Sequence, residues 1–157
     1  MTTTGESTRR LPLIGPAVGQ AQASLTRLLT GILAESGTSH QAWLGLQRLA
    51  ALGGQATREA YQRDLSDWLL LDGPAAARLA GDLVAAGLAD TEGGAVRLTA
   101  QARGLREQVL AASAKITGPM LATIDRDDLE TTVRTLDEIT RRARGIPARP
   151  TAIEDHR

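Results

Sequence analysis

The stretch that decides the fold is DLSDWLLLDGPAAARLAGDLVAAGLADTEGGAVRLT, residues 64–99. Its apolar residues follow helical spacing on both sides of Asp72-Gly73-Pro74, which predicts a turn followed by a helix start, because proline suits the first helical position. After Gly87 the period changes, and two short apolar runs flank Glu92-Gly93-Gly94 in the pattern of a small hairpin. Two helices joined by a turn and followed by a hairpin indicate a winged helix-turn-helix.

Helical spacing also extends upstream of this stretch. It predicts helices over residues 18–33, 40–52 and 58–70, separated by glycines and by Ser/Thr capping residues. Tyr61 and Trp68 lie on the third of these helices, with a leucine near them. Packing in the core is the role that we expect for both side chains.

Two further helices are predicted downstream. Thr99 caps a long helix that Gly118-Pro119 should kink or interrupt, because proline removes a backbone donor and clashes with the preceding turn. Asp125 caps a last helix, which ends in an arginine cluster. This cluster could contact a DNA backbone, but the helix dipole also explains it, because cations stabilise a helix C-terminus.

The predicted fold class is mainly α: a winged helix-turn-helix with a small β-hairpin wing and long N- and C-terminal dimerisation helices. The terminal helices carry more apolar surface than one small domain covers, so we expect a homodimer. The predicted segments are a flexible N-terminal arm (1–16), a folded domain (17–145) that contains the winged helix-turn-helix (57–98) and the dimerisation helices (17–36 and 99–145), and a disordered tail (146–157).

Composition excludes several classes of protein. A chain of 157 residues is the size of one domain, and its 18 basic and 18 acidic residues balance, so it is no polycation. The absence of cysteine excludes disulfide scaffolds and thiolate metal sites. No stretch is long and apolar enough for a signal peptide or a membrane span, which predicts a cytoplasmic protein without a membrane partner. No P-loop or dinucleotide motif occurs, and we expect no cofactor and no metal.

The order of these segments resembles the MarR family of winged-helix regulators. GTSHQAWLGLQRLA (37–50) is similar to that family's second-helix segment, and DLSDWLLLDGPAAARLAGDLVAAGL (64–88) to its helix-turn-helix. AVRLTAQARGL (95–105) is similar to the strand that leaves the wing and to the start of the long dimerisation helix. The resemblance covers residues 18–145. It implies a homodimer whose recognition helices enter successive major grooves of double-stranded DNA, and which responds to a small molecule.

Arg78 and Arg97 are the candidate DNA-binding residues within the reading head, the name used here for residues 57–98. Arg78 lies on the recognition helix and could instead pair with Asp82, one turn later, while Arg97 leaves the wing and could be merely solvated. Residues 73–77 offer no side-chain donor. From residue 57 to 97 the chain has seven acids and four bases, a net charge of −3, which is the wrong sign for DNA.

The resemblance implies a ligand cavity between the second helix and the long dimerisation helix, and His40, Trp43, Arg106 and Val109 are its candidate residues. An imidazole there could bind an anionic or phenolic ligand, or move a proton near neutral pH, and it would be the catalytic residue if the protein were an enzyme. His40 could also be an exposed first-turn residue, and Trp43 a core side chain. The expected guest is an aromatic or lipophilic metabolite.

Three functions remain open at this point. The favoured one is a MarR-like homodimeric transcriptional regulator that binds DNA and responds to a small ligand. The alternative is a MarR-fold protein that has lost DNA binding and uses the cavity to bind an aromatic or lipophilic metabolite, or to act on it as an enzyme. The third is a protein–protein module that pairs with a true regulator through the terminal helices.

Overall fold

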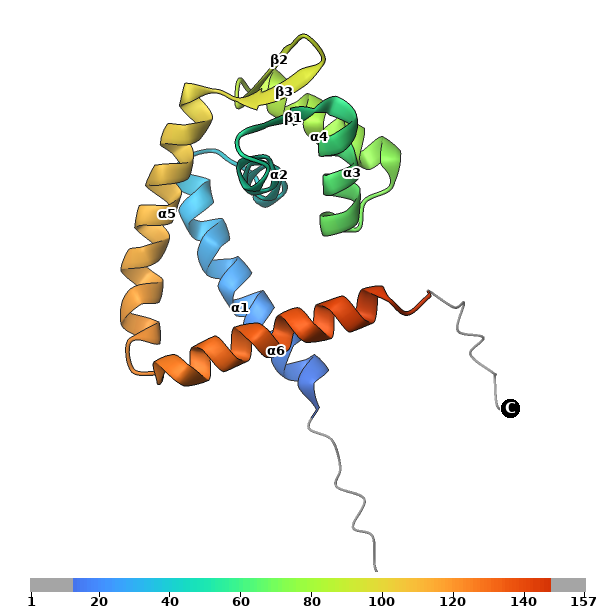
Figure 1. The fold of residues 1–157 in the computed structure, drawn as a ribbon. Helices are drawn as coiled ribbons and strands as arrows, with labels where there is room; N and C mark the ends of the chain where they lie inside the picture. The colour runs from blue at the N-terminus through green and yellow to red at the C-terminus, as the bar shows by residue number, and fades with distance from the viewer. Residues whose placement is uncertain (1–12, 148–157) are drawn as a thin grey trace, which may run out of the picture. The chain divides into compact units, whose positions relative to one another are not determined.

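The computed structural model describes residues 13–147, which form six helices and a small antiparallel sheet (Figure 1). The chain divides into two units, residues 1–114 and 115–157, and α5 passes from the first unit into the second. The helices are α1 (Ile14–Glu35), α2 (His40–Ala51), α3 (Arg58–Leu69), α4 (Gly73–Ala85), α5 (Ala100–Leu121) and α6 (Arg126–Arg144). The strands are β1 (Gln55–Thr57), β2 (Ala89–Glu92) and β3 (Ala95–Leu98).

Side-chain caps begin most of these helices where the sequence predicts them. The oxygen of Ser39 accepts from the backbone N–H of the residue three positions on, at 3.1 Å, and Thr57 and Asp72 do the same for α3 and α4. Thr99 caps α5 and Asp125 caps α6 in the same way. Each cap satisfies a donor that the first turn of a helix leaves unpaired, so these residues fix the helix boundaries.

The wing is a hairpin joined to a third strand. The strands lie in the order β1-β3-β2, and both pairs are antiparallel. Gly93 and Gly94 form the two-residue turn between β2 and β3 with positive φ angles of 57° and 80°, the conformation for which glycine is favoured in tight hairpins. The hairpin is confirmed, while β1 is an addition that the sequence does not predict.

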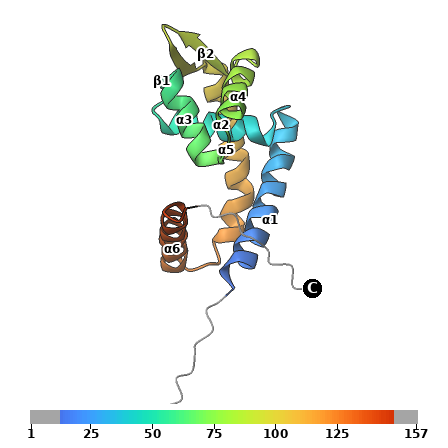
Figure 2. The same ribbon diagram turned by 90° about the vertical axis from the view of Figure 1, so that its right-hand side faces the viewer.

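The core of the first unit lies between α2, α3, α4 and the wing. Tyr61 and Leu65 of α3, Leu83 of α4 and Leu46 of α2 are completely buried, and Val96 of the wing packs with them. Figure 2 shows α3 and α4 side by side, with the wing strands at their end. Burying these side chains together fixes the helix-turn-helix against the wing.

A second, smaller cluster joins the C-terminal end of α1 to α2 and α5. Leu33, Trp43 and Val109 are its buried members, each at most 4% exposed. Trp43 is therefore a core residue packed against the long helix α5, which is the second of the two roles that the sequence left open. This cluster connects the α1–α5 pair to the winged helix.

Three expectations from the sequence are corrected. Helix α1 begins at Ile14, inside the predicted arm, because Pro16 falls in the first turn, where its missing donor would be unpaired in any case. The long helix is not interrupted at Gly118-Pro119 but runs on to Leu121, since the bond lost at Pro119 lies in its last turn. Trp68 is not a core residue, because half of its side chain is exposed.

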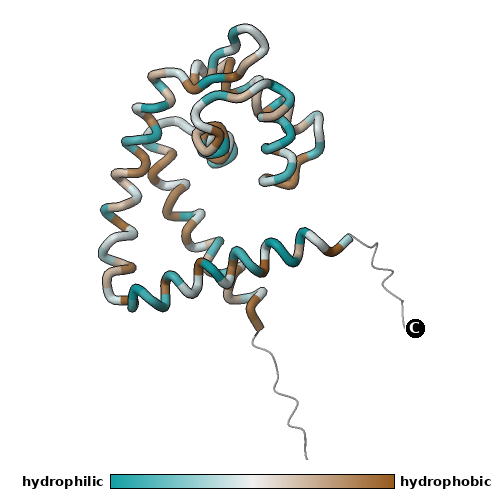
Figure 3. Tube along the Cα trace, viewed as in Figure 1, coloured by the Kyte–Doolittle hydropathy of each residue, from teal (hydrophilic) through white to brown (hydrophobic). Residues whose placement is uncertain are grey.

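The second unit contains the end of α5 and the whole of α6. Helix α6 ends in Arg141, Arg142 and Arg144, and Glu138 forms ion pairs with the first two. Its apolar stripe, which includes Val133 and Leu136, is exposed, and hydrophilic residues separate the stripe's members along the helix (Figure 3). None of the helices within residues 13–147 has the length and apolar character needed to cross a bilayer.

Candidate functional site

The outer face of α4 is exposed and almost without hydrogen-bonding side chains. Pro74, Ala77 and Gly81 lie on this face, and Arg78 and Asp82 supply its functional groups. Within the described residues, the guanidinium of Arg78 forms no ion pair with Asp82, so the pairing that the sequence left open is absent. Arg78 is therefore available to a partner outside the chain.

Arg97, the second candidate DNA contact, is bound to acidic side chains of the wing itself. Its guanidinium donates to the carboxylate of Glu92, and its Nε lies 4.0 Å from a carboxylate oxygen of Asp90. The register explains this, because Asp90 lies directly opposite Arg97 on the neighbouring strand. Part of the charge of Arg97 is thus neutralised within the wing.

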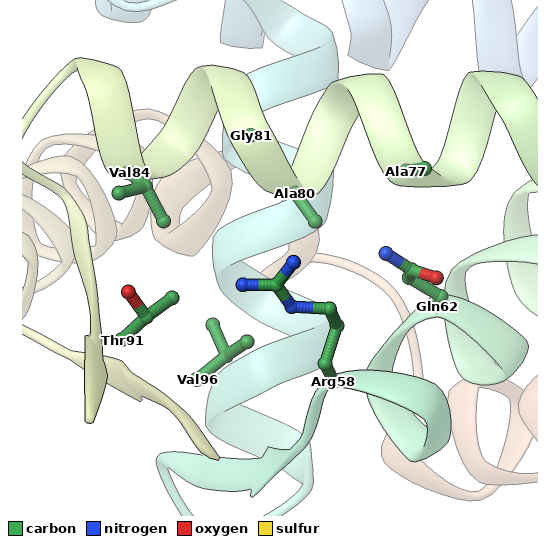
Figure 4. Close-up of a pocket in the computed structure, with 8 residues that line it drawn as sticks. All are labelled: Arg58, Gln62, Ala77, Ala80, Gly81, Val84, Thr91 and Val96. Carbon is green, nitrogen blue, oxygen red and sulfur yellow. The ribbon is translucent and has the colours of Figure 1, made fainter. Parts of the chain in front are cut away.

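A third arginine, which the sequence did not identify, lies between α4 and the wing. Arg58 is the first residue of α3, and it borders a hollow of about 180 Å³ whose walls include Ala80 and Val84 of α4 and Val96 of β3. Figure 4 shows its guanidinium directed into this hollow. The backbone N–H of Arg58 donates to the carbonyl of Gly94 in the wing turn, at 3.1 Å. Because Gly94 is distant in sequence, no local sequence pattern predicts this hydrogen bond.

A polar cluster joins α3 of the reading head to α2. Arg48 donates to both carboxylate oxygens of Asp64, at 2.8 and 2.9 Å, and its guanidinium lies 4.0 Å from the ring centre of Trp68. The hydrogen bond that Arg48 donates to Asp64 raises the pKa of Arg48. A bidentate pair that also stacks on an aromatic ring restricts the rotation of α3, so the cluster is structural in role.

Tyr61 forms the buried hydrogen bond of this region. Its hydroxyl donates to the backbone carbonyl of Gly45, at 2.8 Å, where α2 approaches α3 and α4 closely. A Cβ at Gly45 would lie 2.9 Å from Leu83, so only glycine allows this approach without a shift in the core. Burial raises the pKa of Tyr61 well above its usual value, and the charge of Asp64 raises it further.

The four predicted ligand residues lie on facing parts of α2 and α5, but they do not surround one cavity. Trp43 and Val109 are buried in the same small hydrophobic cluster. The Nε of Arg106 donates to the side-chain oxygen of Gln47, at 2.7 Å. His40 is half-buried in the first turn of α2, one turn before Trp43. Among these four residues, Val109 borders a hollow.

Two adjoining hollows flank the C-terminal end of α1. The larger, of about 460 Å³, lies between the loop after α1, the end of α4 and the first turns of α5. The smaller, of about 230 Å³, lies between α1 and α5 and includes Ile32, Val109 and Ala112. Ser36 and Gln108 border both hollows, and the sequence did not identify either residue. Within residues 13–147, no group of three or more His, Cys, Asp or Glu side chains is placed to hold a metal ion.

Comparison with known proteins identifies the architecture. No protein-family model matches the sequence, and no curated protein sequence matches it. Among solved structures, ligand-free NadR superposes with a TM-score of 0.72 and 20% identity over 87% of this chain and 100% of that chain. Transcriptional regulator PA3341 superposes with a TM-score of 0.69 and 25% identity over 85% of this chain and 99% of that chain. The reduced form of MarR from E. coli superposes with a TM-score of 0.63 and 19% identity over 83% of this chain and 94% of that chain.

The chain has the winged-helix fold of the MarR-type regulators. The resemblance that the sequence motifs predict is thereby confirmed. In this fold α3 and α4 form the helix-turn-helix, the β2–β3 hairpin forms the wing, and α1 and α5 flank them. The hollows beside α1 and the exposed face of α4 therefore belong to two different parts of a MarR-type protein.

Proposed function

We propose that this protein is a MarR-like homodimeric transcriptional regulator that binds double-stranded DNA and releases it in response to a small aromatic or lipophilic ligand. The observation that carries the proposal is the outer face of α4, which is exposed, while the inner face of the same helix packs in the core with α2, α3 and the wing. In proteins of this architecture such a helix enters the major groove. A regulator of this kind would act in the cytoplasm.

The exposed apolar residues of the long helices support a homodimer. Leu13 of the chain preceding α1 is 82% exposed, and Ile14, Val18 and Leu25 of α1 are each about two-fifths exposed or more. Leu110 of α5 is exposed in the same way. A second copy of the chain would cover these side chains and gain the free energy of removing them from water.

The hollows beside α1 support a small aromatic ligand. NadR has been solved in complex with 4-hydroxyphenylacetate, and the organohalide-sensing regulator RdhR with 2,4-dichlorophenol, and both compounds are phenols. In this chain, Ile32, Val109 and Ala112 offer apolar contacts, and the Gln108 amide offers a hydrogen bond. We assign His40, Trp43, Arg106 and Val109 to the ligand region, with Ser36 and Gln108 at the hollows themselves.

DNA binding tests the proposal. The full-length protein should bind a duplex of about 30 base pairs, selected from a random pool, with a shallow salt dependence, because the reading head has only four basic residues and one of them, Arg97, is paired. Arg78→Ala should weaken binding by at least tenfold and relax specificity at one base pair of each half-site, since a bidentate guanine contact contributes about 1–3 kcal/mol and the dimer would lose two of them. Arg97→Ala should weaken it less, because Glu92 and Asp90 already hold that side chain. Nanomolar affinity unchanged in both variants would show that the interface lies elsewhere.

Ligand binding tests the second half of the proposal. Titration with 4-hydroxyphenylacetate should quench the fluorescence of Trp43 in a Trp68→Phe background, and it should release the selected duplex. His40→Ala should weaken this phenolic anion more than a neutral phenol, because only the anion gains from a charged imidazole. A His40→Ala variant with unchanged affinity for both would remove His40 from the ligand site.

The wing also favours a second candidate function. Because Glu92 and Asp90 neutralise Arg97, the structure is compatible with a MarR-fold protein that has lost DNA binding and keeps its ligand site, as a sensor or an enzyme. Failure to bind any duplex at low salt, together with tight ligand binding, would favour this candidate. If the protein is an enzyme, His40→Ala should abolish turnover and leave binding largely intact.

A further inference from the structure

The fold fixes the backbone of Arg58 between the helix-turn-helix and the wing. Thr57 caps α3 through the N–H of Ala60, and the N–H of Arg58 donates to the carbonyl of Gly94. The residue before Arg58 pairs with Ala95 in the β1–β3 ladder. The Cα of Arg58 is therefore held against the wing turn, and Figure 4 shows the direction in which its side chain extends.

That direction leads into the hollow between α4 and the wing. Figure 4 shows the guanidinium lying across the hollow beside Ala80, with Gln62 of α3 on one side and Thr91 of β2 on the other. The walls behind the guanidinium are the small or apolar side chains of α4 and β3. The hollow thus presents one cation, one amide and one hydroxyl toward the outside of the reading head.

Arg58 also differs from Arg48 and Arg97 in having no acidic partner among the described residues, a property that it shares with Arg63 and Arg78. Arg48 is bound to Asp64, and Arg97 is bound to Glu92 and Asp90. Within residues 13–147, Arg58 has no ion pair with any acidic side chain, although Glu59 follows it in the sequence. Its charge is therefore available in full to an anion that enters the hollow.

The geometry of a winged helix on DNA says which anion that is. If α4 lies in the major groove and the wing reaches the adjacent minor groove, the sugar–phosphate strand that separates the two grooves must pass over the space between them. We propose that the Arg58 hollow is a phosphate-binding site for this strand, with Arg58 as its cation and Gln62 and Thr91 as uncharged donors. The inference rests on the proposed function and adds to it the residue that supplies phosphate affinity in a head whose net charge is negative.

The test compares Arg58→Ala with Arg63→Ala in the full-length protein. Arg63 is an exposed arginine of the same helix outside the hollow, so its loss changes the net charge equally. Binding is measured by fluorescence anisotropy on the selected duplex and on a random-sequence duplex across a salt series. Arg58→Ala should weaken binding to both duplexes alike, by about tenfold or more at low salt, and reduce the salt slope by about two, because the dimer loses about one phosphate contact at each half-site. Arg63→Ala should leave the slope unchanged, and Arg58→Lys should largely restore it.

A single methylphosphonate in the selected duplex makes the test specific to one phosphate. Scanned along each strand, it should weaken the wild type at one position per half-site and have no further effect there in Arg58→Ala. Equal slopes for Arg58→Ala and the wild type would overturn the inference while the proposed function stands. If Arg58→Ala changed only the response to 4-hydroxyphenylacetate, the hollow would be a small-molecule site, and the inference would also be overturned. Absence of wild-type binding to either duplex would overturn both proposals.

Discussion

At the scale of single residues, Tyr61 is the most informative side chain, because it is the one tyrosine of the chain and is fully buried. Its hydroxyl donates to a backbone carbonyl on the neighbouring helix, which connects α3 to α2. The sequence predicts the burial of Tyr61 from its place beside Leu65 on the helix. It does not predict the hydrogen bond, because the acceptor is a backbone atom 16 residues away.

Tyr61→Phe should lower the free energy of unfolding by about 1 kcal/mol at neutral pH, since it removes one buried hydrogen bond. The variant should also behave differently at high pH. The pKa of Tyr61 is raised in the folded state, so the unfolded chain loses the phenolic proton first, above about pH 10. Stability that Tyr61 contributes is therefore present below pH 10 and is lost as the pH rises above it, by about 1.4 kcal/mol per pH unit at most.

Urea unfolding at several pH values measures this effect, and absorbance of the tyrosinate near the ultraviolet edge reports the same group directly. The wild type and Tyr61→Phe should have unfolding free energies that converge above pH 10. Parallel curves would mean that the hydroxyl is accessible to water in the folded protein.

Residues whose partners are distant in sequence are where prediction from sequence fails. The sequence predicts Trp68 in the core, but half of the side chain is exposed. Its ring packs instead against the guanidinium of Arg48, which belongs to another helix. Arg58 was overlooked because the wing that gives it a site follows it by more than 30 residues. By contrast, Ser39, Thr57 and Asp125 cap helices as predicted, because a cap depends on neighbours within three residues.

At the scale of the elements, the turn between α3 and α4 contains a strained residue. Leu70 ends α3 in the left-handed conformation, with a φ of 54°, and its side chain is 85% exposed. Among the described residues it is the non-glycine residue with positive φ. A side chain with a Cβ in this conformation costs about 1 kcal/mol or more relative to glycine, so the turn contains removable strain.

Leu70→Gly should therefore stabilise the protein by about 1 kcal/mol and raise its Tm by a few degrees. Leu70→Ala is the matched control, because it removes the exposed apolar side chain but keeps the Cβ and hence the strain. Thermal unfolding followed by circular dichroism separates the two variants. Equal Tm values for glycine and alanine at this position would indicate that the turn is unstrained.

Element boundaries show what short-range patterns can and cannot predict. The wing was predicted because Gly93-Gly94 between two apolar runs is a local turn signal. The three residues of β1 were not, since a strand of that length shows no alternation and exists through its pairing with β3. Two prolines within residues 12–16 favour an irregular arm in the sequence, but α1 begins at Ile14, since proline is tolerated in a first helical turn.

At the scale of the whole molecule, the order of elements was enough to predict the fold, and solved MarR-type regulators confirm it. The hollows beside α1 could not be predicted in the same way. Their shared residues, Ser36 and Gln108, are polar side chains without a motif, and they are brought together by the packing of α1 against α5. A cavity depends on the space that packing leaves, which no local pattern encodes.

The proposed function requires that two copies of the chain bind one DNA duplex through their reading heads. Sedimentation equilibrium of the full-length protein with a selected duplex of about 30 base pairs, at low salt and micromolar concentration, measures this stoichiometry. We expect a dimer in the absence of DNA and a complex of two chains per duplex in its presence. A stable, folded monomer that leaves the duplex unbound would contradict it.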